Sequence, residues 1–149
     1  MGQQQLLLLV LSTVIVGLAT VAGIQAFSEN QAQASQDALV QRATSVASDV
    51  QGLQGKPTQL GGIDLKNSKG YSGADDIAKA LGLGANPFEA QGAGSGGTCV
   101  LSVSSGAVNI QCSSTDAPQG VQVTFDPSAD PQVSTDFGSS YSAGSVSSL

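Results

Sequence analysis

The hydrophobic and polar positions of this chain divide it into three stretches. Residues 6–27 are apolar throughout, with Ser12, Thr13, Thr20 and Gln25 as the only polar side chains. A helix that rises about 1.5 Å per residue needs roughly 20 residues to cross a hydrocarbon layer of about 30 Å. The first stretch therefore predicts a helix that enters a membrane.

A cleaved secretory signal and a plain membrane anchor are alternative interpretations of this stretch. The signal would lack its charged n-region, its apolar part would exceed the usual length, and the site after Ala26 only weakly fits the small-x-small pattern. A plain anchor is disfavoured because no Lys or Arg cluster flanks the stretch to set its orientation.

The second stretch continues the helical pattern with a different polarity. Residues 28–53 contain no proline, and their first glycine is Gly52. The apolar residues recur at spacings of three and four, which is typical of a helix with one apolar face. This stripe consists of Leu39, Ala43, Val46, Val50 and Leu53. We expect one largely continuous helix from Gln3 to Leu53, apolar all round in its first half and on one side in its second.

The third stretch, residues 55–149, is predicted to form a small head. Its start is a connector over 55–97 that contains a short helix at 73–82, capped at Ser72 and stopped by Gly82. The segment 92–97, GAGSGG, formally matches G-x-G-x-x-G. A dinucleotide site would need a strand before this segment and a helix after it, and neither neighbour fits, so we interpret the segment as a flexible loop.

Residues 98–113 predict a β-hairpin with a two-residue turn at Ser105-Gly106. This register places the apolar residues on one face of the hairpin and mostly polar residues on the other. It also brings Cys99 opposite Cys112, with Cα atoms about 4.5 Å apart and within reach of a disulfide. The alternative is a pair of reduced core cysteines. The expected pairs are Ser104 with Ala107, Val103 with Val108, Leu101 with Ile110 and Cys99 with Cys112.

A further strand is predicted where Val121, Val123 and Phe125 alternate with polar residues. Asp126, Asp130 and Asp136 match no dedicated calcium motif, so we interpret them as solvated turn carboxylates. Residues 137–149 form a Ser/Gly-rich tail that Phe137, Tyr141 and Leu149 would hold on a neighbour's surface. The predicted class is α+β: a filament helix at 1–54, the connector at 55–97 and a β-rich head at 98–149.

Composition narrows the possible functions. The net charge of −6 and the five basic residues disfavour a nucleic-acid partner, which needs clustered Lys and Arg. The chain has no histidine, the commonest general base and metal ligand. No group of residues has the pattern of a catalytic, metal or cofactor site, so we expect no enzyme activity.

The Gly2-Gln3-Gln4-Gln5 start, the apolar run and its amphipathic continuation to Leu53 resemble the type IV pilin family, including archaeal pilins and archaellins. The resemblance covers about a third of the chain. It implies cleavage by a prepilin peptidase between Gly2 and Gln3. Many bacterial pilins carry a Glu at the fifth mature position, where this chain offers Gln5 or Leu7.

The resemblance also implies a function. We expect a pilin that leaves the cytoplasmic membrane, with the help of an assembly motor and platform, and joins a helical extracellular filament of its own copies for adhesion, attachment or motility. A minor pilin or secretion pseudopilin and a membrane-anchored extracellular binding module are the alternatives. The predicted filament core comprises Gln3, Gln4, Gln5, Leu6, Leu7, Leu8, Leu9, Val10, Leu11, Val14, Ile15, Val16, Gly17, Leu18, Val21, Gly23, Ile24 and Phe27.

Overall fold

The computed structural model describes residues 2–141. Helix α1 (Gly2–Gln54) is one uninterrupted α-helix, as its lack of internal proline predicted. The chain divides into two compact units, Met1–Ala32 and Gln33–Leu149, and α1 contributes to both. The described residues of the first unit are all helical, and the second unit contains every strand of the described residues.

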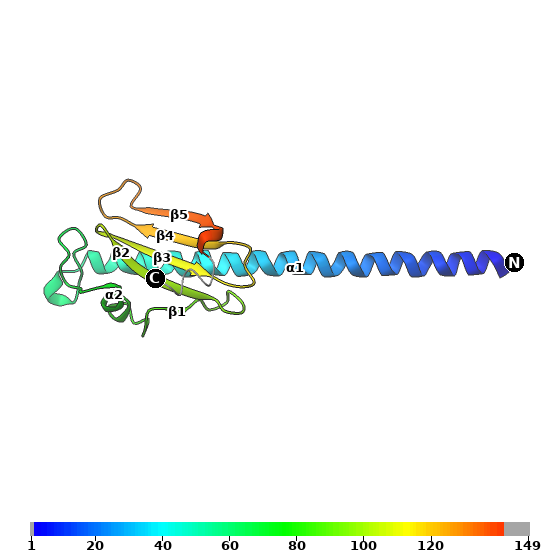
Figure 1. Ribbon diagram of the computed structural model, residues 1–149, viewed down its shortest axis with the longest axis horizontal. Helices are drawn as coiled ribbons and strands as arrows, with labels where there is room; N and C mark the ends of the chain where they lie inside the picture. Colours follow the sequence, from blue (N-terminus) through cyan, green and yellow to red (C-terminus); the bar gives the residue numbers. More distant parts are fainter. Residues whose placement is uncertain (1, 142–149) are drawn as a thin grey trace. The chain divides into compact units, whose positions relative to one another are not determined.

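The second unit is built on an antiparallel sheet of five strands in the order β1-β2-β3-β4-β5. Each strand pairs with the next strand in the sequence, so the sheet is a simple meander (Figure 1). Antiparallel neighbours of this kind need only short turns between them. The strands are β1 (Phe88–Glu89), β2 (Thr98–Ser104), β3 (Ala107–Ser113), β4 (Gly120–Phe125) and β5 (Val133–Gly138).

The β2–β3 hairpin confirms the predicted register at every pair. Ser104 pairs with Ala107 across the turn, and Cys99 lies opposite Cys112. These two cysteines form a disulfide, with their Cα atoms 4.0 Å apart. At the turn Ser105 and Gly106 both have positive φ, of 53° and 82°. Positive φ at both central positions is the conformation of a type I′ two-residue hairpin turn.

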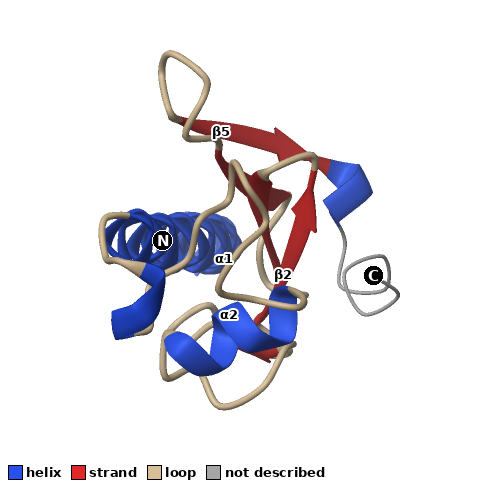
Figure 2. Ribbon diagram, turned by 90° about the vertical axis from the view of Figure 1, so that its left-hand side faces the viewer, coloured by secondary structure: helices blue, strands red, loops and turns tan. Residues whose placement is uncertain are grey.

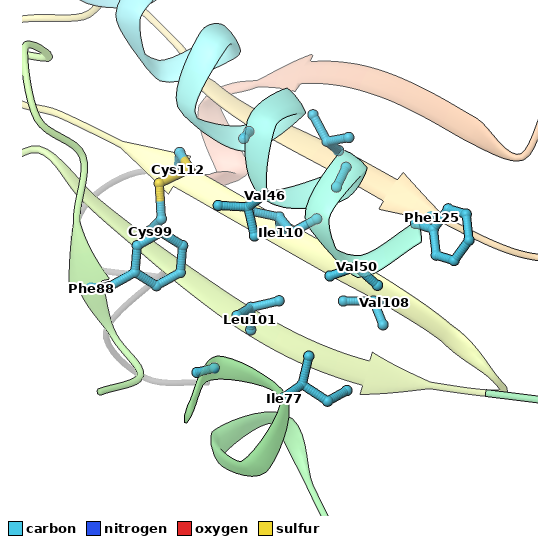
Figure 3. Packing of buried hydrophobic residues seen from close by; sticks show 14 of the residues in the cluster. Val46, Val50, Ile77, Phe88, Cys99, Leu101, Val108, Ile110, Cys112 and Phe125 are labelled. Atoms are coloured by element: carbon cyan, nitrogen blue, oxygen red, sulfur yellow. A yellow bond between two sulfur atoms is a disulfide. The ribbon is translucent and has the colours of Figure 1, made fainter. Parts of the chain in front are cut away.

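The second half of α1 packs against one face of the sheet (Figure 2). All five stripe residues predicted from the sequence are buried, from Leu39 at 0% exposed to Leu53 at 7%. Val46 and Val50 point toward Val108, Ile110 and the disulfide side of the sheet (Figure 3). The amphipathic half of the helix is therefore the main cover of the head's core.

The opposite face of the sheet is polar, as the hairpin pattern predicted. Gln111 donates from Nε2 to Oε1 of Gln122 at 2.7 Å, and the Thr124 hydroxyl donates to Oδ1 of Asn109 at 2.8 Å. These bonds join side chains of β3 and β4 that lie side by side in the register. The sheet thus has one face in the core and one face turned outward.

Helix α2 (Ala74–Ala80) is shorter than the predicted 73–82. Gly73 takes the N-cap position, and no side chain caps the helix in the way expected of Ser72. Instead the backbone N–H of Ser72 donates to Oδ2 of Asp76 at 2.9 Å. Ile77 and Ala78 are buried, so α2 covers the β2 side of the core, as Figure 3 shows for Ile77.

Two strands were not predicted. The pairing of β1 with β2 is only two residues long, and Phe88 at its start is buried. The pairing of β5 with β4 covers six residues and includes Phe137, which we had assigned to the tail. Tyr141 lies in a short 3-10 helix, Ser139–Tyr141, whereas Leu149 and its expected contact lie outside the described residues. The predicted α+β class with a β-rich head is confirmed.

Candidate functional site

The first unit presents an apolar surface that has no partner among residues 2–141. Every residue from Gly2 to Gln31 is exposed. The thirteen large apolar side chains between Leu6 and Phe27 are 51% to 72% exposed. A soluble domain rarely leaves so large an apolar surface in water, and such surfaces mark membrane or protein contacts.

The hydroxyl groups in this surface are satisfied by the helix itself. Ser12 Oγ donates to the Leu9 carbonyl at 2.9 Å, Thr13 Oγ1 to the Val10 carbonyl at 2.8 Å, and Thr20 Oγ1 to the Gly17 carbonyl at 2.8 Å. Burying a hydroxyl in apolar surroundings is costly only when it lacks a hydrogen-bond partner. The three hydroxyl groups within the apolar run are therefore compatible with a dry environment.

By length and composition α1 is able to cross a membrane. Its most apolar window has a mean hydropathy of 2.5, and no side chain in that window is buried within the chain. A membrane anchor, a signal sequence and an assembly helix all share these properties. The helix is consistent with a location at a membrane or cell surface.

Small residues lie four positions apart in the apolar half of α1, at Thr13/Gly17 and Ala19/Gly23. A Cβ added at Gly17 or Gly23 would meet no atom within 4 Å. The helix is thus open at both positions. In membrane helices such spacing allows the backbones of two helices to approach closely.

The predicted processing residues lie in the first turn of α1. Gly2 and Gln3 are helical and exposed, as are Gln4 and Gln5. The structure brings no other described residue to them, and a Cβ at Gly2 would meet nothing within 4 Å. Cleavage there stays a prediction.

The 92–97 loop is more constrained than its composition indicated. The Ser95 backbone N–H donates to Oδ2 of Asp116 at 2.6 Å, and the Thr115 hydroxyl donates to the Ser95 carbonyl at 2.7 Å. A two-residue strand precedes the loop and β2 follows it. Because no helix follows, the loop has no helix N-terminus to face a phosphate. The expectation of a flexible loop missed these bonds, because Ser114, Thr115 and Asp116 are remote in sequence.

Two of the three aspartates considered for calcium, Asp126 and Asp136, accept local hydrogen bonds. Asp126 Oδ1 accepts from the Ser128 N–H at 2.8 Å, and Asp136 Oδ2 accepts from the Tyr141 hydroxyl at 3.3 Å. Burial and the neighbouring Asp136 carboxylate raise the pKa of Tyr141. Among residues 2–141 no group of three His, Cys, Asp or Glu side chains has the arrangement of a metal site.

A groove that the sequence did not reveal lies between α2 and β2. It has a volume of about 1280 Å³, and its lining includes Tyr71, Asp75, Lys79 and Ser102. The groove is wide and mostly polar, unlike the enclosed apolar pockets that hold most small ligands. It offers no paired nucleophile and base among the lining side chains, since the one carboxylate hydrogen bond there goes to the Ser72 backbone.

Comparison of the chain with protein-family models, curated proteins and solved structures gave no match. The exposed apolar half of α1 is therefore the candidate functional site on its own physical properties, and no relative assigns it a role.

Proposed function

We propose that this protein is a structural subunit of the type IV pilin kind, which polymerises through the first half of α1 into a helical extracellular filament. The observation that carries the proposal is that large apolar side chains are exposed in one half of α1 and buried in the other. All thirteen large apolar side chains of residues 6–27 are exposed, whereas the buried core among the described residues lies within residues 39–125. The exposed set needs partners outside its own chain.

The size of the effect supports assembly over isolation in water. Covering a large apolar side chain is worth about 1.5 to 3 kcal/mol, so thirteen of them amount to roughly 20 to 40 kcal/mol gross. Copies of the same helix provide an equally apolar cover. A filament core made of these helices would remove the whole surface from water at once.

A membrane provides the same cover before assembly. Since lipid tails are as apolar as leucine, moving the helix from bilayer to filament yields little hydrophobic free energy. Extraction would then depend on an assembly motor and platform, and maturation on a prepilin peptidase acting between Gly2 and Gln3. Close packing at Gly17 and Gly23 would add contact between helices that lipid does not provide.

The second candidate is a membrane-anchored extracellular module that acts as a single copy. It is favoured by the length and hydropathy of α1, which suffice for an anchor. In the filament the first half of α1 would pack against other copies, whereas in the anchored module it would stay in the bilayer. A short fibre built from a minor pilin or pseudopilin would also pack these helices together, and would differ from the main filament in abundance and length.

The test is assembly of the full chain after detergent removal. We expect filaments by negative-stain electron microscopy and a pelletable fraction that contains intact 3–53 peptide by mass spectrometry. The matched control is a chain that lacks residues 2–32, which retains every described buried residue and should stay in the supernatant. Full-length protein that returns only to added lipid vesicles, without filaments, would support the anchored module instead.

A further inference from the structure

Arg42 is the only arginine of the chain and the only basic residue within α1. It lies in the second unit, one position before the buried Ala43 of the core stripe. The four lysines, Lys56, Lys66, Lys69 and Lys79, all follow the helix and are exposed. Arg42 is therefore the only positively charged side chain that α1 offers to anything packed along it.

The surroundings of Arg42 hold the guanidinium without neutralising it. Its Cζ lies 5.4 Å from the centre of the Phe88 ring, in the geometry of a cation–π contact. Its Nε is buried and has no hydrogen-bond partner. Within residues 2–141 no carboxylate forms an ion pair with it. The buried Nε is out of reach of another molecule, but neither terminal amino group of Arg42 is among the buried unpaired donors. The outer end of this half-buried guanidinium, positioned by an aromatic ring, can therefore receive a carboxylate from outside.

Glu29 is the matching charge. It is the only charged residue of the first unit's described helix, and it is exposed. No hydrogen bond or ion pair engages it among the described residues. It lies two positions beyond Phe27, the last residue of the apolar run, which is 72% exposed. Burying that run among neighbouring helices on every side would also take Glu29 partly out of water, and a carboxylate in that position needs a cation to offset its lost hydration.

We propose that, in the assembled filament, Glu29 of one copy forms an ion pair with Arg42 of a neighbouring copy, and that this contact fixes the register between the helices. The inference rests on the proposed assembly function and adds its specificity element. A uniformly apolar helix can slide along its neighbour at little cost. A pair between Glu29, the only charged residue of 2–32, and Arg42, the only basic residue of α1, favours one alignment over the others.

The test compares single and paired charge changes in the assembly assay. Glu29→Gln and Arg42→Gln should each raise the lowest concentration that gives filaments about fivefold, the effect of one modest ion pair per contact. Single reversals, Glu29→Arg and Arg42→Glu, should raise it further by placing like charges together. The double reversal Glu29→Arg/Arg42→Glu should return most of the assembly. Lys79→Gln, with the same charge change as Arg42→Gln, should leave it unchanged.

Folding and function are separated by two further readouts. Glu29 forms no hydrogen bond with the described residues of the second unit, so Glu29→Gln must keep the wild-type thermal midpoint. A change in the assembly of this variant then cannot come from a damaged head. Normal assembly of Glu29→Gln and Arg42→Gln, or no recovery in the double reversal, would overturn the ion pair while leaving the filament proposal intact. Failure of the wild-type chain to form filaments would overturn both.

Discussion

The two halves of α1 carry apolar residues of the same types, but the first half exposes them and the second half buries them. Val14 in the first half is 52% exposed, whereas Val46 in the second half is 1% exposed. Both sit in regular helix, so backbone conformation does not distinguish them. The difference lies in what surrounds them: the second half packs on the sheet, and the first half has no cover among the described residues.

This comparison shows that one secondary-structure element can serve two purposes separated along its length. Helical stability in proteins comes mostly from packing an apolar face. The second half obtains that packing within the chain and so belongs to the fold. The first half has no such packing among the described residues, and in the proposed filament it would obtain it from other copies. Substitutions in the two halves should therefore fail in different assays.

The largest expected effect is on the core side. Val46→Asp would bury an unpaired carboxylate between α1 and the sheet, which costs more than about 4 kcal/mol. We expect loss of the cooperative unfolding transition, measured by circular dichroism of the detergent-solubilised chain. A Val46→Asp protein that keeps the wild-type thermal midpoint would show that the helix does not form the core cover described here.

The same substitution in the first half gives the matched comparison. Val14→Asp should leave the thermal midpoint of the head within about 2 °C of wild type, because Val14 contributes nothing to the described core. It should abolish filaments, since a charge in the apolar seam is expensive to bury. The comparison breaks if Val14→Asp destabilises the head or assembles normally.

The disulfide is expected to stabilise the head alone, by a smaller amount than the core contact of Val46. Cys99 and Cys112 are both fully buried and 13 positions apart in sequence. Replacing both with alanine should lower the free energy of unfolding by about 3 kcal/mol, as the chain-entropy model gives for a loop of this length. Urea denaturation of the double variant measures this change. An unchanged urea midpoint would mean that packing of the sheet on α1 already holds the hairpin. The helix of the first unit should be unaffected by the double substitution.

The smallest effect concerns Asp64, in the loop after α1. Asn67 donates to this carboxylate from Nδ2 at 2.7 Å and from its backbone N–H at 3.1 Å, and these bonds lower the pKa of Asp64. A lowered folded-state pKa means that the stabilisation is present above the ordinary aspartate pKa and is lost as pH falls through the folded value.

Asn67→Ala should therefore raise the pKa of Asp64 toward its ordinary value, as followed by carboxyl-carbon NMR. Lys69→Gln is the control and should move it less, because the charge of Lys69 is the weakest cause of the shift. A larger change from Lys69→Gln than from Asn67→Ala would contradict the hydrogen-bond origin.

Much of the fold followed from local pattern. The core stripe of α1, the hairpin register and the cysteine pairing were predicted because period and turn chemistry act over a few residues. The strand at Val133–Gly138 was missed although the strand-favouring Val133, Thr135 and Phe137 alternate with Ser134 and Asp136. Its side chains are mostly exposed, and its strand form comes from backbone pairing with β4, a partner that only the folded chain supplies.

The apolar surface of residues 6–27 was determined by the sequence alone, because an uncharged run of that length is apolar on every side of a helix. Tertiary structure decided which residues lacked a partner. It placed Phe88 over Arg42 from 46 positions away and closed the core over the second half of α1 while leaving the arginine without a counter-charge. Long-range contacts of this kind depend on how the sheet packs against the helix, and no local pattern specifies that packing.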